Sequence, residues 1–355
     1  MTPKFHRLRI AELRRETPEA VSLRFEVPPE LARDYAFVQG QHVTLRTHLD
    51  GQEVRRSYSI CAGVDDGELR IAIKKVPDGL FSSYANAQIR AGDAIDVLTP
   101  EGRFQTLLDP HNSKHYAAFA AGSGITPVLS LIKTTLRREP RSRFTLAYGN
   151  RRLASTMFQE TLEDLKDRYL GRFTLYNLFS REEQEVELFN GRLDGAKVKA
   201  FADTLLPVET IDEAFVCGPG AMLDEIQAAL RELGMPAERI HLERFGVPSA
   251  GPAHHSEPGD APHARVTVVL DGVRREVEFR RDDSSILEAA LRAGLDLPYS
   301  CRGGMCCTCR ARVLDGKVRM DKNYSLERRD LDAGFVLTCQ SHPLTERVII
   351  SYDAR

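Results

Sequence analysis

The sequence of 355 residues lacks any long apolar run and carries almost no net charge. No segment approaches the roughly 18 consecutive apolar residues of a transmembrane helix, so we expect no membrane span and no membrane partner. The first residues, MTPKFHRLRIAELRRE, contain no apolar core of the kind found in a signal peptide. A formal net charge of −2 gives no reason to expect a nucleic-acid partner.

Cysteine is also scarce, with seven residues in the whole chain. So few cysteines, most of them close together near the end of the sequence, do not form a disulfide framework, and a reduced cytoplasm is the expected location. Internal repeats are absent as well. The length favours two or three domains.

The scarce cysteines are concentrated in one loop, CRGGMCCTC, which begins at Cys301. Its C-x4-C-x2-C spacing, followed by a distant fourth cysteine, is typical of plant-type [2Fe–2S] clusters. We therefore predict that the cluster ligands are Cys301, Cys306, Cys309 and Cys339. Cys307 is predicted to be a bystander, because adjacent cysteines cannot easily both point at one cluster. A zinc site is the alternative, but zinc favours two C-x2-C pairs and the loop has one.

The periodicity of apolar residues divides the chain into three domains and a linker. Residues 1–110 carry alternating patterns such as VSLRFEV and LRIAIKKV, which predict an antiparallel β-barrel. Residues 111–245 alternate strands with helices, which predicts a parallel α/β sheet. Residues 246–262 are rich in proline and glycine and are predicted to be a linker. Residues 263–355 begin with a hairpin pattern and form the domain that contains the cysteine loop.

Two short motifs in the barrel segment could together bind an anion. The first, RSYS, ends a predicted strand, and the second, GLFSS, begins the only predicted helix of this segment. Arginine, serine and a helix N-terminus suit a phosphate, while a tyrosine offers a flat face for a ring. Each motif is weak evidence alone. The residues concerned are Arg56, Tyr58, Ser59, Gly79, Ser82 and Ser83.

Two further motifs end strands of the α/β segment. The first, Gly122-x-Gly124-x-x-Pro127, follows a strand and opens a helix, which is where α/β sheets bind a pyrophosphate. Proline replaces the third glycine of the usual dinucleotide motif and is well tolerated at a first helical position. The second motif is Cys217-Gly218-Pro219. A buried cysteine with no role in binding is the alternative for the second motif.

Three arginines follow the second and third strands of the α/β segment, namely Arg151, Arg152 and Arg181. No Asp or Glu stands at the end of the second strand, where NAD-dependent enzymes bind the ribose hydroxyls. Arginine suits the additional 2′-phosphate of NADPH. We therefore predict a preference for NADPH, with a solvated surface cluster as the alternative.

Taken together, these motifs resemble the ferredoxin–NADP reductase superfamily with a C-terminal plant-type ferredoxin domain. The resemblance implies FAD in the barrel, NADPH on the parallel sheet and a β-grasp fold around the [2Fe–2S] cluster. It also implies a role for each matching residue. Arg56 would meet the flavin pyrophosphate and Tyr58 would pack on the isoalloxazine. Residues near the reacting atoms would be Ser59, Thr126 and Cys217, and residues at a flavin phosphate would be Gly79, Ser82 and Ser83.

The order of the domains and the sequence around the cysteines resemble reductase components of multicomponent oxygenases. The greatest similarity is to the subfamily that serves ring-1,2-phenylacetyl-CoA epoxidases, which implies a di-iron oxygenase partner in phenylacetate degradation. Electrons would pass from NADPH to FAD, to the [2Fe–2S] cluster and then to the oxygenase. Two alternatives stay open: a reductase for a steroid or aromatic-ring hydroxylase, and a nucleotide-responsive iron–sulfur redox sensor.

Overall fold

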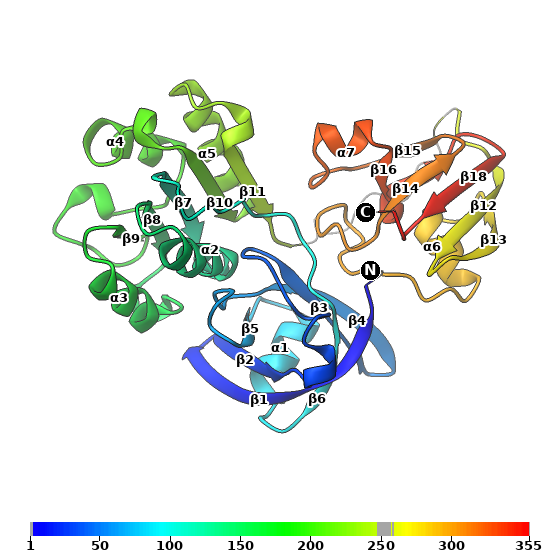
Figure 1. The fold of residues 1–355 in the computed structure, drawn as a ribbon, viewed down its shortest axis with the longest axis horizontal. Helices are drawn as coiled ribbons and strands as arrows, with labels where there is room; N and C mark the ends of the chain where they lie inside the picture. Colours follow the sequence, from blue (N-terminus) through cyan, green and yellow to red (C-terminus); the bar gives the residue numbers. More distant parts are fainter. Residues whose placement is uncertain (1–2, 247–256, 258, 355) are drawn as a thin grey trace. The chain divides into compact units, whose positions relative to one another are not determined.

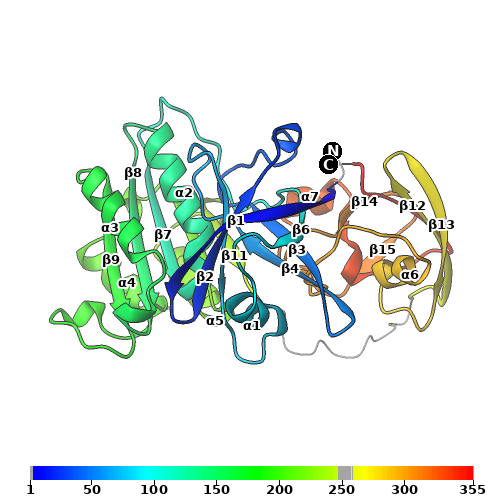
Figure 2. The same cartoon turned by 90° about the horizontal axis from the view of Figure 1, so that it is seen from below.

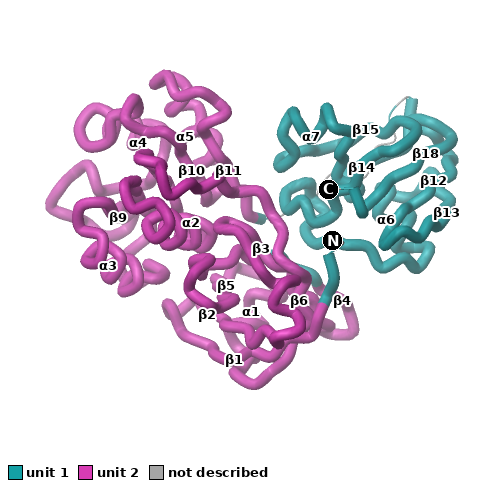
Figure 3. The backbone as a smooth tube through the Cα atoms, viewed as in Figure 1, with its two compact units in different colours: residues 1–5, 55–57, 246–355 teal, residues 6–54, 58–245 magenta. Residues whose placement is uncertain are grey.

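The computed structural model describes residues 3–246, 257 and 259–354, and these form two compact units (Figure 1 and Figure 3). Unit 1 contains the described residues within Met1–Phe5, Arg55–Ser57 and Gly246–Arg355, and unit 2 comprises His6–Val54 and Tyr58–Phe245. Residues 247–256 and 258 of the predicted linker lie outside the described residues. Among the helices that are described, none is long and apolar enough to cross a bilayer.

Residues 5–98 contain a six-stranded sheet in the order β4-β3-β6-β1-β2-β5 (Figure 1), and Figure 2 shows this part of the chain from below. The strand pairs β1–β2, β2–β5 and β3–β6 are antiparallel. A bridge between Ile60 and Ile71 links the residue after β4 to β5, so the sheet closes on itself. The elements are β1 (Phe5–Thr17), β2 (Ala20–Glu26), β3 (His42–Leu49), β4 (Gln52–Ser59), β5 (Leu69–Lys74), β6 (Ala94–Leu98) and helix α1 (Leu80–Ala87). The predicted antiparallel barrel is confirmed.

The second part of unit 2 is a five-stranded sheet in the order β11-β10-β7-β8-β9, and every neighbouring pair is parallel. Its strands are β7 (His115–Ala121), β8 (Arg143–Asn150), β9 (Phe173–Phe179), β10 (Glu213–Gly218) and β11 (Ile240–Arg244). Its helices are α2 (Ile125–Arg138), α3 (Gln159–Arg168), α4 (Gly195–Thr204) and α5 (Gly220–Glu232). The predicted parallel α/β sheet is confirmed.

After His115, strand β7 consists of alanine and aromatic residues, because helices cover both of its faces. Tyr116 and Ala118 pack in one cluster with α2 and α3, while Ala117 and Phe119 pack in another with α4 and α5. In the sheet, β7 lies between β8, which follows it in the sequence, and β10, which comes much later. The order of the strands therefore reverses at β7. Open sheets of this kind bind ligands at such a switch point, beyond the carboxyl ends of the strands. Here those ends are the two predicted nucleotide motifs.

Unit 1 contains a mixed sheet in the order β13-β12-β18-β14-β16 and a two-stranded sheet of β15 and β17. Strands β12 and β18 are parallel, and the hairpin of β12 and β13 turns at Asp271 and Gly272, both with positive φ. Its strands are β12 (His263–Leu270), β13 (Val273–Arg280), β14 (Arg310–Asp315), β15 (Val318–Met320), β16 (Phe335–Leu337), β17 (Ser341–Pro343) and β18 (Arg347–Ser351). Helix α6 (Ile286–Arg292) shares a core with β12 and β18, and α7 (Arg328–Asp332) precedes β16. This arrangement is the predicted β-grasp fold.

Candidate functional site

Helix α1 begins at a tight turn that leaves its first N–H groups without a side-chain cap. A Cβ at Gly79 would lie 2.4 Å from both Ser82 Oγ and a methyl group of Val76, so only glycine fits there. The Ser82 hydroxyl accepts the Val76 N–H at 3.2 Å and donates to the Gly79 carbonyl at 3.2 Å. Ser82 therefore shapes the turn, and half-buried Ser83 is the serine of this motif that remains for an anion at the helix N-terminus.

The residues of the RSYS motif occupy the end of β4. The Tyr58 ring is half-buried and packs on Phe81 of α1, with ring centroids 5.6 Å apart. Ser59 is buried, whereas Arg56 is exposed and donates to the carbonyl oxygen of Arg55 at 2.8 Å. Because side chains alternate along a strand, Arg56 and Tyr58 share one face of β4. The motif therefore presents a cation and an aromatic ring on the same side.

The two motifs of the parallel sheet are in direct backbone contact. Gly122–Gly124 forms a 3-10 turn after β7, in which Gly122 has a φ of +55°. A Cβ at Gly124 would lie 2.1 Å from the carbonyl oxygen of Cys217 and 3.0 Å from the nitrogen of Gly218. No residue larger than glycine fits that approach, which explains why this glycine is needed beside the Cys217-Gly-Pro strand end.

Side chains hold the glycine turn in its conformation. The Tyr148 hydroxyl donates to the Gly122 carbonyl at 2.9 Å, and the Thr126 hydroxyl donates to the Ser123 carbonyl at 2.9 Å. Pro127 stands at the third helical position of α2, not at the first as predicted. The position is still tolerated, because an N–H in the first turn has no intrahelical partner to lose.

The loops after β8 and β9 are joined by backbone hydrogen bonds. Ser180 donates its N–H to the Asn150 carbonyl at 3.0 Å, and Arg181 donates to the Arg151 carbonyl at 2.9 Å. The three predicted arginines are exposed here. Beside them the Glu182 carboxylate accepts the N–H of Leu153 at 3.0 Å. The structure thus brings the predicted 2′-phosphate residues to one edge, together with an acidic neighbour that the sequence analysis did not consider.

Asn150 is a residue of this edge that sequence reasoning missed. It is only 8% exposed, yet its side-chain amide makes no hydrogen bond within the part of the chain that the structure describes. A buried amide without a partner is costly, which suits a ligand-binding position at the end of β8. Its position in the sequence, directly before the predicted 2′-phosphate residue Arg151, was the feature that could have identified it as a binding residue.

Lys74, at the end of β5, was also missed. Its ammonium nitrogen lies 3.5 Å from where a Cβ at Gly122 would stand, so a cation of the barrel approaches the glycine turn of the α/β sheet. Burial lowers the pKa of Lys74, the charge of Glu19 raises it and the charge of Arg151 lowers it further. Lys74 and Arg151 therefore lie close enough for their positive charges to repel each other. An anion bound between them would stabilise the charged forms of both side chains.

Glu243 on β11 is a third residue that sequence reasoning missed. The register of the sheet places it opposite Cys217 of β10. Burial raises the pKa of Glu243 to about 8, and burial followed by the charge of Glu243 raises the pKa of the Cys217 thiol well above its usual value. Both groups are therefore mainly neutral at pH 7. A pair of neutral groups suits the uncharged ring of a reduced nicotinamide.

In unit 1 the predicted cluster ligands meet as two pairs. The thiols of Cys301 and Cys306 lie within hydrogen-bonding reach, as do those of Cys309 and Cys339. The hydrogen bond from Cys306 and those from backbone N–H groups lower the pKa of Cys301 to about 5. Cys309 also lies close enough to Cys301 and Cys306 for their charges to raise its pKa, so all four predicted ligands gather at one place, as a [2Fe–2S] cluster requires.

Other groups around the loop fit an iron–sulfur cluster. The Ser300 hydroxyl is buried beside Cys301 and has no hydrogen-bond partner in the described ranges, whereas a cluster sulfur would accept its proton. The backbone N–H groups of Gly303 and Met305 point at the Cys301 sulfur, at 3.3 and 3.4 Å. Cys307 has a φ of +57° and donates its thiol to Ser325 Oγ at 3.0 Å.

Comparison with protein families places all three parts of the chain. Residues 8–106 match the oxidoreductase FAD-binding domain, residues 119–228 the oxidoreductase NAD-binding domain, and residues 268–344 the 2Fe-2S iron-sulfur cluster binding domain. The chain is 47% identical to one of the subunits of the 1,2-phenylacetyl-CoA epoxidase of Escherichia coli K12, over 99% of this chain and 98% of that one. The chain belongs to the ferredoxin–NADP reductase superfamily.

Members of this superfamily with the same extent include the ferredoxin reductase component of the 3-ketosteroid-9-alpha-monooxygenase of Rhodococcus rhodochrous. It is 34% identical over 97% of this chain and 96% of its own. Among solved structures, phthalate dioxygenase reductase covers 98% of both chains with a TM-score of 0.60 at 22% identity. The predicted fold class and the predicted FAD, nicotinamide-nucleotide and [2Fe–2S] cofactors are confirmed. The protein is an oxidoreductase.

Replacement of single cysteines tests the ligand assignment. Cys339→Ser should abolish the iron–sulfur absorption, because one iron loses a thiolate. Cys307→Ser should leave the absorption intact, since the Cys307 thiol donates to Ser325 Oγ at 3.0 Å. The measurement is the visible spectrum with iron analysis, at about two irons per chain in the unmodified protein. Loss of the absorption in the Cys307 variant would refute the assignment.

The neutral carboxyl of Glu243 predicts a pH-dependent stability. Because its pKa is raised to about 8 in the folded protein, the folded state keeps a proton that the unfolded chain releases from about pH 4.5 upward. Its contribution to stability therefore falls as pH rises from about 5 to 8. As pH rises across this window, the Tm of Glu243→Gln should increase relative to the Tm of the unmodified protein. Parallel Tm curves would contradict the prediction.

Proposed function

We propose that this protein is the NADPH-dependent reductase component of a phenylacetyl-CoA epoxidase. The observation that carries the proposal is the 47% identity to an epoxidase subunit over nearly the full length of both chains. The steroid monooxygenase reductases are 34–35% identical over similar lengths, so they support a second candidate, the reductase of another hydroxylase. In either case the partner is an oxygenase component, of the di-iron type for the epoxidase. We expect both proteins in the cytoplasm.

Bound FAD supplies the central chemistry, because it accepts two electrons as a hydride and releases them singly to the [2Fe–2S] cluster. The residues of the chain bind and orient the groups. On the flavin we place Arg56 at the pyrophosphate, Tyr58 against the ring and Ser59 near the reactive nitrogen. We assign a flavin phosphate to the N-terminus of α1, where Gly79 and Ser82 build the turn and Ser83 would meet the phosphate. The cluster ligands are Cys301, Cys306, Cys309 and Cys339.

The nucleotide is proposed to bind across the switch point of the parallel sheet. Its pyrophosphate would meet the uncapped N-terminus of α2 and the ammonium of Lys74. The nicotinamide would lie beside Thr126 and Cys217. The close contact of Gly124 with the Cys217 carbonyl keeps those two side chains on adjoining elements. The residues that would line the nucleotide are Gly122, Gly124, Thr126, Pro127, Cys217, Gly218 and Pro219.

Preference for NADPH is proposed to come from the arginines at the joined loops. The backbone bond from Arg181 to Arg151 places two guanidinium groups on neighbouring loops, where they can meet the 2′-phosphate together. Arg152 follows directly and is also exposed. The nearby Glu182 carboxylate accepts the N–H of Leu153 and so contributes to the conformation of the loop.

Two substitutions test separately how the protein recognises the 2′-phosphate and the pyrophosphate of the nucleotide. Arg151→Gln removes a charge-assisted hydrogen bond worth about 1.5–3 kcal/mol, so kcat/KM for NADPH should fall roughly 10- to 150-fold while that for NADH changes little. Lys74→Met should lower kcat/KM for both nucleotides by similar factors, because both share the pyrophosphate. Steady-state reduction of ferricyanide measures each value. Equal rates with NADPH and NADH in the unmodified protein would rule out the preference.

Reconstitution tests the partner. With NADPH and the purified oxygenase component of a phenylacetyl-CoA epoxidase, the protein should support epoxidation of phenylacetyl-CoA. The oxygenase component of a 3-ketosteroid monooxygenase serves as the matched comparison and should be supported more weakly, in line with the lower identity of its reductase. The reverse order of rates would favour the second candidate. Failure to reduce any acceptor from NADPH would favour a redox sensor.

A further inference from the structure

The barrel and the parallel sheet of unit 2 share one continuous apolar contact. Ala20, Cys61 and Ala72 of the barrel belong to the same buried cluster as Val128 and Ile132 of α2. Apolar burial is strong but not directional. This contact therefore holds the flavin barrel and the nucleotide sheet together, while other groups must fix how one is turned against the other.

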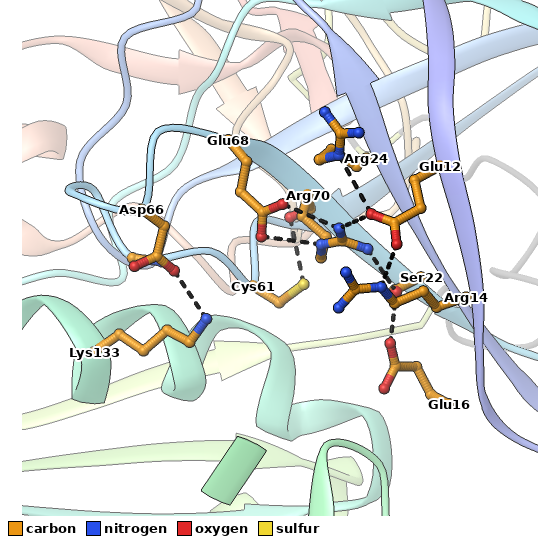
Figure 4. A network of polar contacts seen from close by, with 11 residues as sticks. Glu12, Arg14, Glu16, Ser22, Arg24, Cys61, Asp66, Glu68, Arg70 and Lys133 are labelled. Atoms are coloured by element: carbon orange, nitrogen blue, oxygen red, sulfur yellow. Dashed lines mark hydrogen bonds and ion pairs between the residues drawn. The ribbon is translucent and has the colours of Figure 1, made fainter. Parts of the chain in front are cut away.

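Directional bonds are found at the rim of that contact, between α2 and the loop of residues 63–66. The Arg138 guanidinium donates to both carboxylate oxygens of Asp65, each at 2.8 Å. The Lys133 ammonium donates to Asp66 at 2.8 Å (Figure 4). A third contact is the hydrogen bond from the N–H of Val64 to the side-chain oxygen of Thr134 at 3.1 Å. We refer to these three contacts, which comprise four hydrogen bonds, as the interdomain latch.

Both halves of the interdomain latch are stiff. The Asp66 carboxylate also accepts the N–H of Gly63 at 2.8 Å, which closes the loop into a tight turn. A Cβ at Gly63 would lie 2.9 Å from Cβ of Lys133, so the loop rests directly on the helix. On the other side, Thr134 is buried and its hydroxyl donates to the Ser130 carbonyl at 2.7 Å. A movement of the helix is therefore transmitted to the loop.

The loop and the helix each lead directly to a cofactor position. Gly63 follows Ser59 by four residues, and Lys133 follows Thr126 by seven residues along one helix, which is about 10 Å at the helical rise of about 1.5 Å per residue. We propose that the interdomain latch is a positioning device that sets the distance between the flavin and the nicotinamide. This inference rests on the proposed places of Ser59 and Thr126 beside the reacting atoms.

The exposure of the latch side chains separates this role from a purely structural one. The side chains of Asp65 and Arg138 are 29% and 42% exposed, and partly exposed ion pairs contribute little to folding stability. Hydride transfer, in contrast, needs reacting atoms about 3–3.5 Å apart, and an error of about 1 Å costs roughly 100-fold in rate. Loss of the latch should therefore affect the rate far more than the stability.

The test compares the holoenzyme with Asp65→Asn/Asp66→Asn and with a control variant, Asp96→Asn. The control breaks a bond of Arg46 to Asp96 at 3.0 Å, an equally exposed carboxylate that lies wholly within the barrel. Stopped-flow reduction of the flavin at saturating NADPH should be about tenfold slower in the double variant, with KM nearly unchanged. The control should keep the rate of the unmodified protein. Flavin content, cluster spectrum and Tm should be alike in the two variants.

A second readout does not depend on turnover. Amide hydrogen exchange at Val64, measured without nucleotide, should accelerate in the double variant and stay slow in the control, because its bond to Thr134 depends on the loop resting on α2. In a separate pair of variants, Asp65→Arg alone should slow flavin reduction. The exchange Asp65→Arg/Arg138→Asp should recover most of the lost rate, since the ion pair is rebuilt with reversed polarity.

Two outcomes would overturn the inference. One is a rate of flavin reduction in the double variant equal to that of Asp96→Asn. The other is a slowed rate that the reversed pair fails to restore. If the unmodified protein does not reduce its flavin with NADPH or NADH, the proposed function itself fails, and that result is distinct from both.

Discussion

The approach of Gly124 to the carbonyl of Cys217 is the constraint on which the nucleotide half of the protein depends. Two strands that are neighbours in the sheet but about 90 residues apart in the sequence end at the same point, and a Cβ on Gly124 would lie 2.1 Å from the carbonyl oxygen. The first turn of α2 can begin there only because one partner has no side chain. Tyr148, Thr126 and the neutral carboxyl of Glu243 are all arranged around this contact.

Local patterns were sufficient to predict most of the architecture. The alternation in VSLRFEV indicates a strand buried on one face, as in a barrel. The mainly apolar HYAAFAA indicates a strand buried on both faces, as in a parallel sheet. Both folds could therefore be predicted from the sequence. The cysteine spacing likewise specifies a chemistry, because ligands in one loop need few long-range contacts. Lys74 and Glu243 were not accessible, since each acts through a neighbour from a distant part of the chain. A lysine at the end of a strand has no local feature that marks it.

Electrostatics divides the site of unit 2 into regions of different character. The edge with Lys74, Arg151 and Arg181 is cationic, and the cost of burying Lys74 is visible in its lowered pKa. The strand ends at Cys217 and Glu243 are neutral at pH 7 because burial disfavours their charged forms. A nicotinamide nucleotide has the same division, with charge at its phosphates and a neutral reduced ring. In the proposed placement, the match between these regions would orient the nucleotide along the sheet edge as well as bind it.

The positions of the four predicted cluster ligands have a consequence for how the protein would mature. Cys301, Cys306 and Cys309 belong to one loop, so three of these ligands are close together in the sequence. Cys309 and Cys339 are 30 positions apart, and Cys339 reaches its partner only once β14 and β16 are paired and the 3-10 turn at Thr338–Gln340 has formed. Bringing these two cysteines together lowers the entropy of the chain, and the formation of the sheet offsets this cost. If these four thiols hold the cluster, the set of ligands is complete only in a chain whose unit 1 has folded.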